Sequence, residues 1–404
     1  MPDLLRGTAV VSEEAVGGPS TSSHENPTND VRVSIRELAL FFLRLGTTAF
    51  GGPAAHIAIM EDELVRRRRW LSRETFLDLL GASNLIPGPS SSELAIHTGY
   101  LCGGRVGLLL AGICFILPAA LMVMAIGALY VHYGELPAME GILYGVKPVV
   151  IGVVLQALLG LARTAIKTSL LGVLSVVALG LAIGGLHPLL LLLLCGFAAC
   201  ASALFASRSA PGALPAFTIG TATIGTATGL SMGSLFLVFL KMGAIVFGSG
   251  YVLLAFLRND LVLHRGWLTD AQLVDAVAVG QITPGPVFTT ATFIGYVLGG
   301  IRGAIVTTVG IFLPAFLLVA ASGPLVPKIR KSKVAGAFLN GVNVASLALM
   351  AAVSWQLGRA SLVDAPTAIM AVAAFLGLVL WRVNSAWLVL CGALMGAVLR
   401  ATIR

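Results

Sequence analysis

Charged residues are scarce in this sequence of 404 residues: Asp, Glu, Lys and Arg make up only 11% of it, whereas hydrophobic residues make up 57%. Water-soluble domains carry about 25% charged residues, so the chain lacks the polar surface that a soluble fold requires. Its mean hydropathy is +0.95, and apolar runs of about twenty residues, each long enough to cross a bilayer, recur from Leu38 to the C-terminus. The composition therefore excludes a soluble protein and predicts an all-α polytopic membrane protein.

Sequence patterns of metal, disulfide and nucleotide sites are also absent. The five cysteines lie in or near apolar runs without CxxC spacing, so neither a disulfide framework nor a metal site is indicated. The chain contains no Walker A pattern, no HExxH and no paired Cys/His ligands. We therefore expect a protein without cofactors and without enzymatic activity, whose energy comes from an ion gradient rather than from ATP.

The N-terminal residues 1–35 lack the apolar core of a secretory signal peptide, and their polar composition predicts a disordered tail. The net charge of +8 comes from Lys and Arg that lie mostly between apolar segments. This distribution is typical of loops that flank a membrane, and it argues against nucleic acid as a partner. We expect the run Arg66–Arg69 to face phospholipid headgroups.

The rest of the chain contains an internal repeat. FFLRLGTTAFGGP at 41–53 aligns with VFLKMGAIVFGSG at 238–250, and the same alignment superimposes the Pro-Gly-Pro motifs at 87–89 and 284–286. Such self-similarity indicates a duplicated unit. The predicted organisation is an N-terminal transmembrane repeat at 36–205, a connector at 206–232 and a C-terminal transmembrane repeat at 233–404.

Loop charges indicate how the two repeats are oriented. The loop at 61–75 carries five arginines and its counterpart at 258–270 only two, whereas 132–140 has no Lys or Arg and its counterpart near 328–333 has four. Loops rich in Lys and Arg stay in the cytoplasm, so equivalent loops are expected on opposite faces. We predict inverted-topology repeats, with about 10 spanning helices plus broken or re-entrant Pro-Gly-Pro segments; a parallel repeat is the alternative.

The Pro-Gly-Pro motifs are expected to interrupt helices inside the membrane, because proline lacks an N–H and clashes with the preceding turn. A new helix that starts there, with proline at its first position, presents free N–H groups and a positive dipole end to an anion. Amide and hydroxyl side chains flank both motifs. The predicted substrate-binding residues of these segments are Asn84, Gly88, Ser90, Ser91 and Ser92, and Gln281, Gly285, Thr289 and Thr290.

Two alternatives remain open at these segments. Each Pro-Gly-Pro can instead simply turn a hairpin between two spans. FGGP at 50–53 and FGSG at 247–250 are a second candidate pair of breaks, which adds Gly51 and Gly52 to the predicted site. Glycine there can equally serve close helix packing.

Ionisable residues inside apolar segments are functional candidates. Arg44 and Lys241 occupy matched positions and are the predicted counter-charges of an anion, with snorkelling or a structural ion pair as the alternative. Asp78, Asp275 and Glu93 are the predicted proton-coupling residues. For the two aspartates the alternative is a salt bridge to Arg44 or Lys241, and Glu93 can instead face water. Lys147 stands alone in its segment, and a substrate role is open for it.

Together these motifs resemble the chromate ion transporter family, in its long-chain two-domain form. The resemblance rests on FGGP, on Trp-Leu after a basic loop and on Pro-Gly-Pro before small hydroxyl residues, repeated as FGSG, Trp-Leu and Pro-Gly-Pro, and it covers Leu38 to Arg400. It implies a carrier of the bacterial inner membrane that exports chromate, is driven by the proton-motive force, confers resistance and has antiparallel halves. Ser249 and Gly250 depart from FGGP, which puts equal roles for the halves in doubt.

The expected partners are therefore chromate or a sulfate-like oxyanion, protons and membrane lipid, with a homodimer as a further possibility. Chromate is a tetrahedral dianion very like sulfate, and the residues do not rank the two. A carrier of sulfate or another oxyanion and an uncoupled anion channel stay open as alternatives.

Overall fold

The computed structural model describes residues 33–50, 52–84, 86–133, 137–206, 230–246, 252–322, 333–381 and 383–403, and every regular element in these ranges is helical. Five of the described helices are long and apolar enough to cross a membrane, and four more apolar helices are shorter. The prediction of an all-α polytopic membrane protein is confirmed. Most of the expected tail and connector lies outside the described residues.

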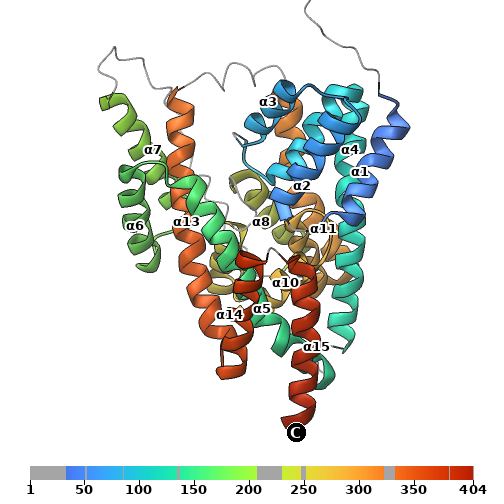
Figure 1. Ribbon diagram of the computed structural model, residues 1–404, viewed down its shortest axis with the longest axis vertical. Helices are drawn as coiled ribbons and strands as arrows, with labels where there is room; N and C mark the ends of the chain where they lie inside the picture. The colour runs from blue at the N-terminus through green and yellow to red at the C-terminus, as the bar shows by residue number, and fades with distance from the viewer. Residues whose placement is uncertain are drawn as a thin grey trace, which may run out of the picture. The chain divides into compact units, whose positions relative to one another are not determined.

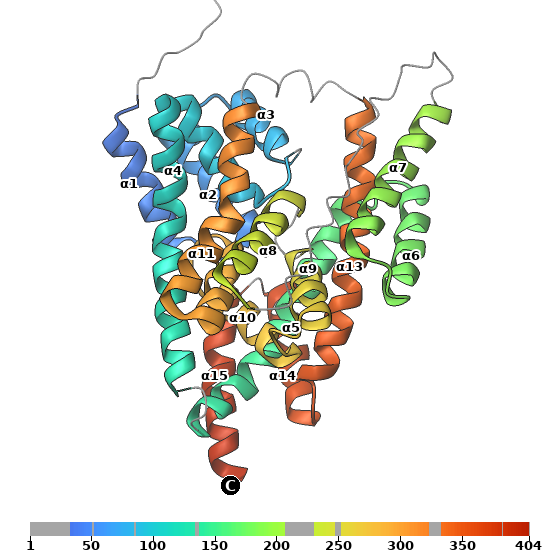
Figure 2. The same ribbon diagram turned by 180° about the vertical axis from the view of Figure 1, so that it is seen from behind.

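The elements follow in two matching series (Figures 1 and 2). The first series contains α1 (Ile35–Thr48), α2 (Gly52–Glu61), the π-helix η1 (Asp62–Arg67), α3 (Arg73–Ser83), α4 (Ser90–Tyr133), α5 (Pro137–Ala165), α6 (Ser169–Ile183) and α7 (Pro188–Ala206). The second contains α8 (Met232–Ile245), α9 (Leu253–Leu257), the π-helix η3 (Arg258–His264), α10 (Asp270–Ile282), the 3-10 helix η4 (Val287–Thr289), α11 (Thr290–Ser322), α13 (Lys333–Ser361), α14 (Ala365–Leu380) and α15 (Ser385–Ile403).

Equivalent sequence signals start equivalent helices in the two series. Ser72 caps α3, where its side chain accepts a hydrogen bond from the Thr75 N–H. Thr269 caps α10 in the same way from the Gln272 N–H and completes a capping box. Serine and threonine are favoured there because they satisfy N–H groups that the first helical turn leaves free. The residue that follows each Trp-Leu motif thus fixes where the broken segment begins.

The helices α4 and α11 are each folded back on themselves. Their backbones leave the helical conformation at Gly103 and Gly104 and at Gly299 and Gly300. The Thr307 hydroxyl donates a 2.8 Å hydrogen bond to the carbonyl of Ala291, 16 residues earlier, although a continuous helix would separate these residues by about 24 Å. Each helix therefore consists of a short arm (90–102 or 290–298) packed against a long arm (105–133 or 301–322).

The two long arms run in opposite directions, as inverted repeats require. The long arm of α4 ends near the end of the bundle at which the C-terminus lies (Figure 1), whereas that of α11 ends near α3 at the other end (Figure 2). The basic residues Arg66–Arg69 precede α3. The ends of α11 and α13 that flank the Lys- and Arg-bearing residues 323–332 lie at the same end of the bundle (Figure 2). This placement agrees with the loop-charge argument.

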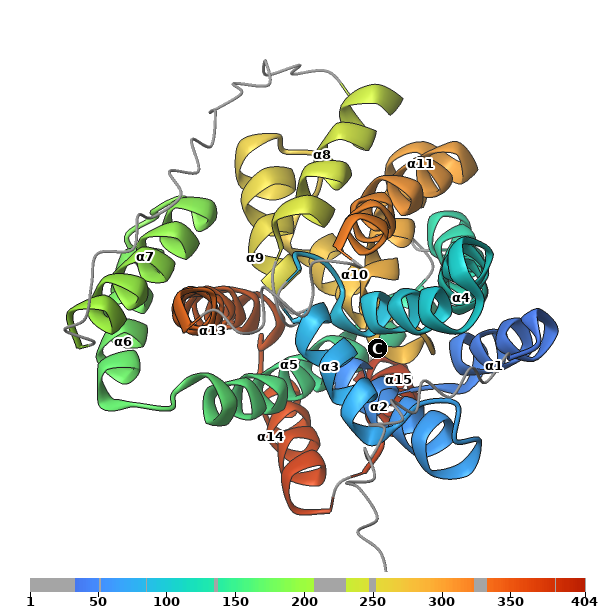
Figure 3. The same ribbon diagram turned by 90° about the horizontal axis from the view of Figure 1, so that it is seen from above.

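The two series are also intertwined. The helix α5 of the first series packs against α14 and α15 of the second, and α13 of the second packs against α6 and α7 of the first. Figure 3 shows these groups on either side of the contact between α5 and α13. The pair α14 and α15 therefore covers α5, and the pair α6 and α7 covers α13. This arrangement brings the broken segments together between the two groups of helices.

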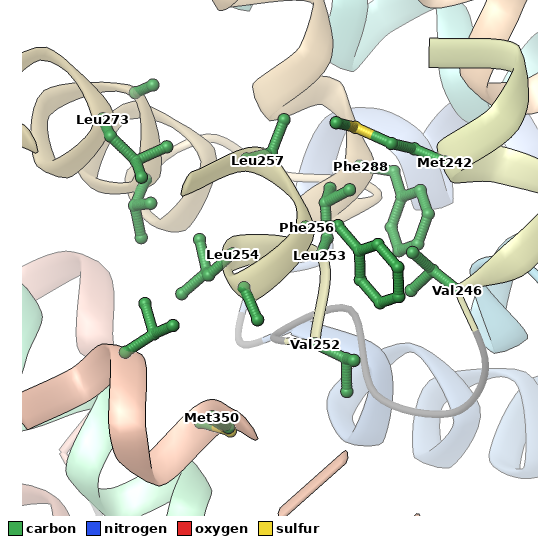
Figure 4. Close-up of a cluster of buried hydrophobic side chains, with 14 of the residues drawn as sticks. Met242, Val246, Val252, Leu253, Leu254, Phe256, Leu257, Leu273, Phe288 and Met350 are labelled. Carbon is green, nitrogen blue, oxygen red and sulfur yellow. The ribbon is translucent and has the colours of Figure 1, made fainter. Parts of the chain in front are cut away.

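A cluster of buried side chains holds the second broken region in place. Val246, at the end of α8, lies close to Phe256 and Phe288 in the interior (Figure 4), and all three are essentially inaccessible to solvent. Phe288 follows the second Pro-Gly-Pro motif almost directly. Close packing gives these side chains van der Waals contacts, which drive helix association within a membrane, so the backbone on both sides of this region is anchored by packing.

The closed hairpin of α11 yields a first prediction. A Cβ added at Gly295 would overlap the Gly303 carbonyl and the Thr307 hydroxyl, whereas a Cβ at Gly336 in α13 would meet no atom within 4 Å. Gly295→Ala should lower the thermal unfolding midpoint in detergent, because overpacking costs about 1–3 kcal/mol. Gly336→Ala is the matched control and should be neutral or slightly stabilising. Equal midpoints for the two variants would contradict the packed hairpin.

Candidate functional site

Two crossed backbone hydrogen bonds join the broken segments. The N–H of Gly88 in the first Pro-Gly-Pro donates to the carbonyl of Val246 at 2.7 Å, and that of Gly285 in the second donates to the carbonyl of Ala49 at 3.0 Å. Ala49 directly follows α1, and Val246 directly follows α8. Each Pro-Gly-Pro loop is thus bonded to the end of the first helix of the other repeat.

Glycine is required at the centre of both loops. Gly88 and Gly285 have φ values of 140° and 92°, which residues with a Cβ rarely adopt. Neighbouring atoms also leave no room for a side chain at either glycine. A Cβ at Gly285 would lie 2.6 Å from the Cβ of Ala119, and a Cβ at Gly88 would overlap the Glu93 carboxylate. The prolines differ slightly from the prediction, because Pro286 and Pro89 lie at the cap position directly before the helical turns rather than at the first helical position.

The FGGP segment is a second break, which decides between the two alternatives left open for it. The helix α1 ends at Thr48 and α2 begins at Gly52, whose φ is 74°. Its predicted partner at 247–250 lies outside the described residues, and so does Gly51. The apolar stretch 37–60 is therefore two helices rather than one continuous segment.

A buried histidine connects this break to the first Pro-Gly-Pro. His56 on α2 places Nε2 at 3.0 Å from the carbonyl oxygen of Ala49 and Nδ1 at 3.4 Å from the hydroxyl of Ser91. A carbonyl oxygen can only accept, so Nε2 carries the proton and Nδ1 accepts from Ser91. The sequence did not suggest His56, and no spacing rule links it to a serine 35 residues away.

The short arm of α4 presents buried polar atoms that have no hydrogen-bond partner among the described residues. These atoms are Ser92 Oγ, both carboxylate oxygens of Glu93, His97 Nε2 and Thr98 Oγ1. Glu93 is completely buried and folds back toward Gly88. Buried polar groups in proteins are almost always paired, so this surface is suited to a polar guest that completes its hydrogen bonds.

The second loop does not repeat this arrangement. The hydroxyls of Thr289 and Thr290 donate to the carbonyls of Pro286 and Val287, each at 2.8 Å. Both were predicted as donors to an anion, but their hydrogens are already used by the backbone. The two tips are therefore chemically unequal.

The predicted amides Asn84 and Gln281 lie at equivalent places with different exposure. Asn84 is exposed at the end of α3, whereas Gln281 is buried near the end of α10. Ser90, also predicted, is buried in the first turn of α4.

Asp275 is the centre of a polar cluster that connects three helices. Its carboxylate accepts a 3.0 Å hydrogen bond from the Tyr130 hydroxyl on α4. The Lys147 ammonium on α5 lies 3.2 Å from the other carboxylate oxygen, at ion-pair distance but without the alignment of a hydrogen bond. Asp275 is buried, and 22% of the Lys147 side chain is exposed.

This cluster corrects the alternative that Asp275 pairs with Arg44 or Lys241. Lys241 instead pairs with Asp260 at 2.9 Å, and Arg44 is an exposed side chain of α1. Asp78, the counterpart of Asp275, is partly exposed on α3. The role of Arg44 and Lys241 as counter-charges stays a prediction, and the geometry does not favour it for Lys241.

A cavity of about 540 Å³ reaches the broken segments at Phe50 and Gln281. Its polar lining residues are Gln156 and Arg163 of α5, Asn384 and Ser385 at the start of α15, and Gln281. Of these, only Gln281 was predicted. A signal was present, because Gln156, Gly160 and Arg163 share one face of an otherwise apolar helix.

Comparisons with known proteins give matches over most of the chain. The profile of the Chromate transporter family matches residues 36–200 and 233–397. A chromate transport protein of Cupriavidus metallidurans is 34% identical over 385 residues, which cover 92% of this chain and 94% of that protein. A probable chromate transport protein of Synechococcus elongatus is 36% identical over 352 residues, which cover 85% and 89% of the two chains.

The matches also include a relative of lower sequence identity. An uncharacterized transporter of Methanocaldococcus jannaschii is 26% identical over 337 residues, which cover 80% of this chain and 84% of that protein. No solved structure gives a significant match.

The pair of Lys147 and Asp275 generates a second prediction. Lys147→Ala leaves a buried carboxylate without its cation, and such breakage costs about 3–5 kcal/mol when both partners are buried. The cost should be smaller here because Lys147 is partly exposed. The thermal midpoint in detergent should fall for Lys147→Ala and recover in the double variant Lys147→Met with Asp275→Leu. Lys167→Ala, an exposed lysine in the turn after α5, is the control; a fall no larger than in this control would contradict the pairing.

Proposed function

The chain belongs to the chromate transporter family, and from this membership we propose that it is a secondary transporter that exports chromate from the cytoplasm across the bacterial inner membrane. The proton-motive force drives the export, and the activity confers resistance to chromate. Among the described residues none forms a cluster that could hold a metal ion, and the proposal assigns no chemical step to the protein.

The observation that carries the proposal is the pairing of the two breaks by crossed hydrogen bonds. Secondary transporters built from inverted repeats place their substrate at the repeat interface, where interrupted helices aim their N-termini at anionic groups. Non-helical backbone at membrane depth is tolerated only against protein or a polar cavity. Here the first break adds the Ser92 hydroxyl, which has no partner among the described residues, and the N-terminus of the short arm of α4, which together are a donor set for a tetrahedral oxyanion.

Proton coupling is assigned to carboxylates near the breaks. Glu93 lies beside Gly88 at the tip itself, and Asp275 lies on the helix that leads to the second tip. A carboxylate and an oxyanion repel each other at close range, so a protonated Glu93 tolerates the oxyanion better than an ionised one. Exchange of a proton for chromate at one place is the basis of the proposed antiport, with Asp78 and Asp275 as further proton carriers.

Flux in everted membrane vesicles tests the function. Labelled chromate should accumulate in vesicles that contain the protein, the uptake should rise when the lumen is made acidic, and a protonophore should abolish the rise. Passive uptake that ignores the gradient would favour an anion channel. Competition by sulfate measures whether the site distinguishes the two dianions, and uptake of sulfate alone would overturn the chromate assignment.

The role of Glu93 predicts the effect of one neutral substitution. Glu93→Gln cannot exchange a proton, so chromate counterflow should persist while the response to an imposed pH gradient disappears. Glu37→Gln, on an exposed acid in the first turn of α1, should retain the full response. If Glu93→Gln keeps the response of the unmodified protein, Glu93 is not the coupling residue.

A further inference from the structure

The 540 Å³ cavity has the charge of an anion site. Arg163 lines it and makes no ion pair with any described residue, and no acidic side chain contributes to the wall. The amides of Gln156 and Asn384 provide additional donors, and Gln281 and Phe50 connect the cavity with the breaks. A guanidinium that keeps its charge beside neutral donors is the usual chemistry of oxyanion recognition.

The internal repeat relates this cavity to a second, smaller one of about 130 Å³. A shift of 196 positions superimposes lining residues of the two, which pair as Val153 with Leu349, Gly160 with Gln356, Ala182 with Leu378, Ile183 with Val379 and Pro188 with Asn384. Both cavities lie where a long helix of one repeat meets the terminal helix pair of the other. They are therefore equivalent positions of the inverted architecture in unequal states.

The smaller cavity differs in charge and in filling. Arg258 lines it, but its guanidinium is bound by both carboxylate oxygens of Asp270 at 2.8 and 3.0 Å. Gln356 stands where the larger cavity has Gly160, and a Cβ at Gly160 would meet no atom within 4 Å. The larger cavity is wide and carries an unmatched positive charge, whereas the smaller is narrow and its charge is neutralised.

The two cavities line helices that run in opposite directions. The helix α5 rises from the end that bears the C-terminus toward the end at which α3 lies, and α13 runs the other way (Figure 1). The cavities line the second half of each helix. Because the basic residues Arg66–Arg69 mark the α3 end as cytoplasmic, the larger cavity lies on the cytoplasmic side.

We propose that the larger cavity is the cytoplasmic vestibule in which the oxyanion is loaded, with Arg163 as its binding residue, and that the smaller cavity is the narrow exit on the opposite side. This proposal rests on the proposed export of an oxyanion, and it adds the path that the oxyanion takes through the protein. An unmatched cation at the entrance and a neutralised one at the exit favour loading at the first and release at the second.

Substitution of Arg163 tests the vestibule. Arg163→Ala should raise the KM for chromate uptake into everted vesicles about tenfold, which corresponds to one charge-assisted contact, and should leave the maximal rate nearly unchanged. Arg359→Ala is the matched control, because Arg359 is the repeat counterpart, is equally exposed at the end of α13, and lines neither cavity. Its KM should stay that of the unmodified protein.

A second variant closes the cavity without removing a charge. Gly160→Gln places in the larger cavity the side chain that narrows the smaller one, and it replaces glycine in a helix with a better helix former. The protein should fold normally and the maximal rate should drop to a small fraction. Gly180→Leu in α6 is the control: a Cβ there meets no atom within 4 Å, and its repeat counterpart is Leu376.

Equilibrium dialysis of the detergent-solubilised protein with labelled chromate separates this proposal from the function itself. If chromate binds, and binds more weakly to Arg163→Ala than to Arg359→Ala, the result supports the vestibule whether or not vesicles take up chromate. Absence of uptake into vesicles would overturn the proposed export but not the vestibule. Equal binding and equal KM in the two arginine variants would overturn the vestibule. An undiminished rate in Gly160→Gln would overturn it as well.

Discussion

The structure depends on the hydrogen bonds by which Gly88 and Gly285 each donate to the helix end of the other repeat. A helix interrupted in a membrane exposes N–H and C=O groups that lipid cannot satisfy. Here each interruption supplies one of the groups that the other lacks, so the two breaks satisfy each other only because the repeats are intertwined. The same contact places both loops at the interface, where the cavity residues Phe50 and Gln281 also lie.

Symmetry in the backbone is combined with asymmetry in the side chains. Kinks, caps and crossed bonds recur in both repeats, but the short arm that follows the first loop carries unpaired polar atoms at residues 92–98, whereas Thr289 and Thr290 after the second loop use their hydroxyls on the backbone. Lys147 pairs with Asp275, and its own repeat counterpart is Asn343. One half thus offers groups that can hold a guest, and the other contributes a packed, internally bonded support. This division agrees with the departure of FGSG from FGGP.

Local rules were sufficient to predict where helices stop. Proline and positive-φ glycine act through the backbone within a few residues, so both Pro-Gly-Pro breaks were predicted, with an error of one position for the prolines, and FGGP was at least a candidate for a further break. The pairing of charges was not readable, because Lys147 and Asp275 belong to different repeats and meet only through packing of α5 on α10. His56 was missed because it meets Ser91, 35 residues away in the same repeat, only through tertiary packing of α2 on α4. Arg163 was missed although the polar face of α5 carried a usable signal.

The central claim is that the paired breaks hold the transported oxyanion. Chromium scatters X-rays anomalously, so crystals of the protein grown with chromate locate the ion directly. The account predicts an anomalous peak within hydrogen-bonding reach of the first turn of the short arm of α4, beside Ser91 and Ser92. A peak confined to a lipid-facing surface, or ordered chromate far from both loops, would contradict it.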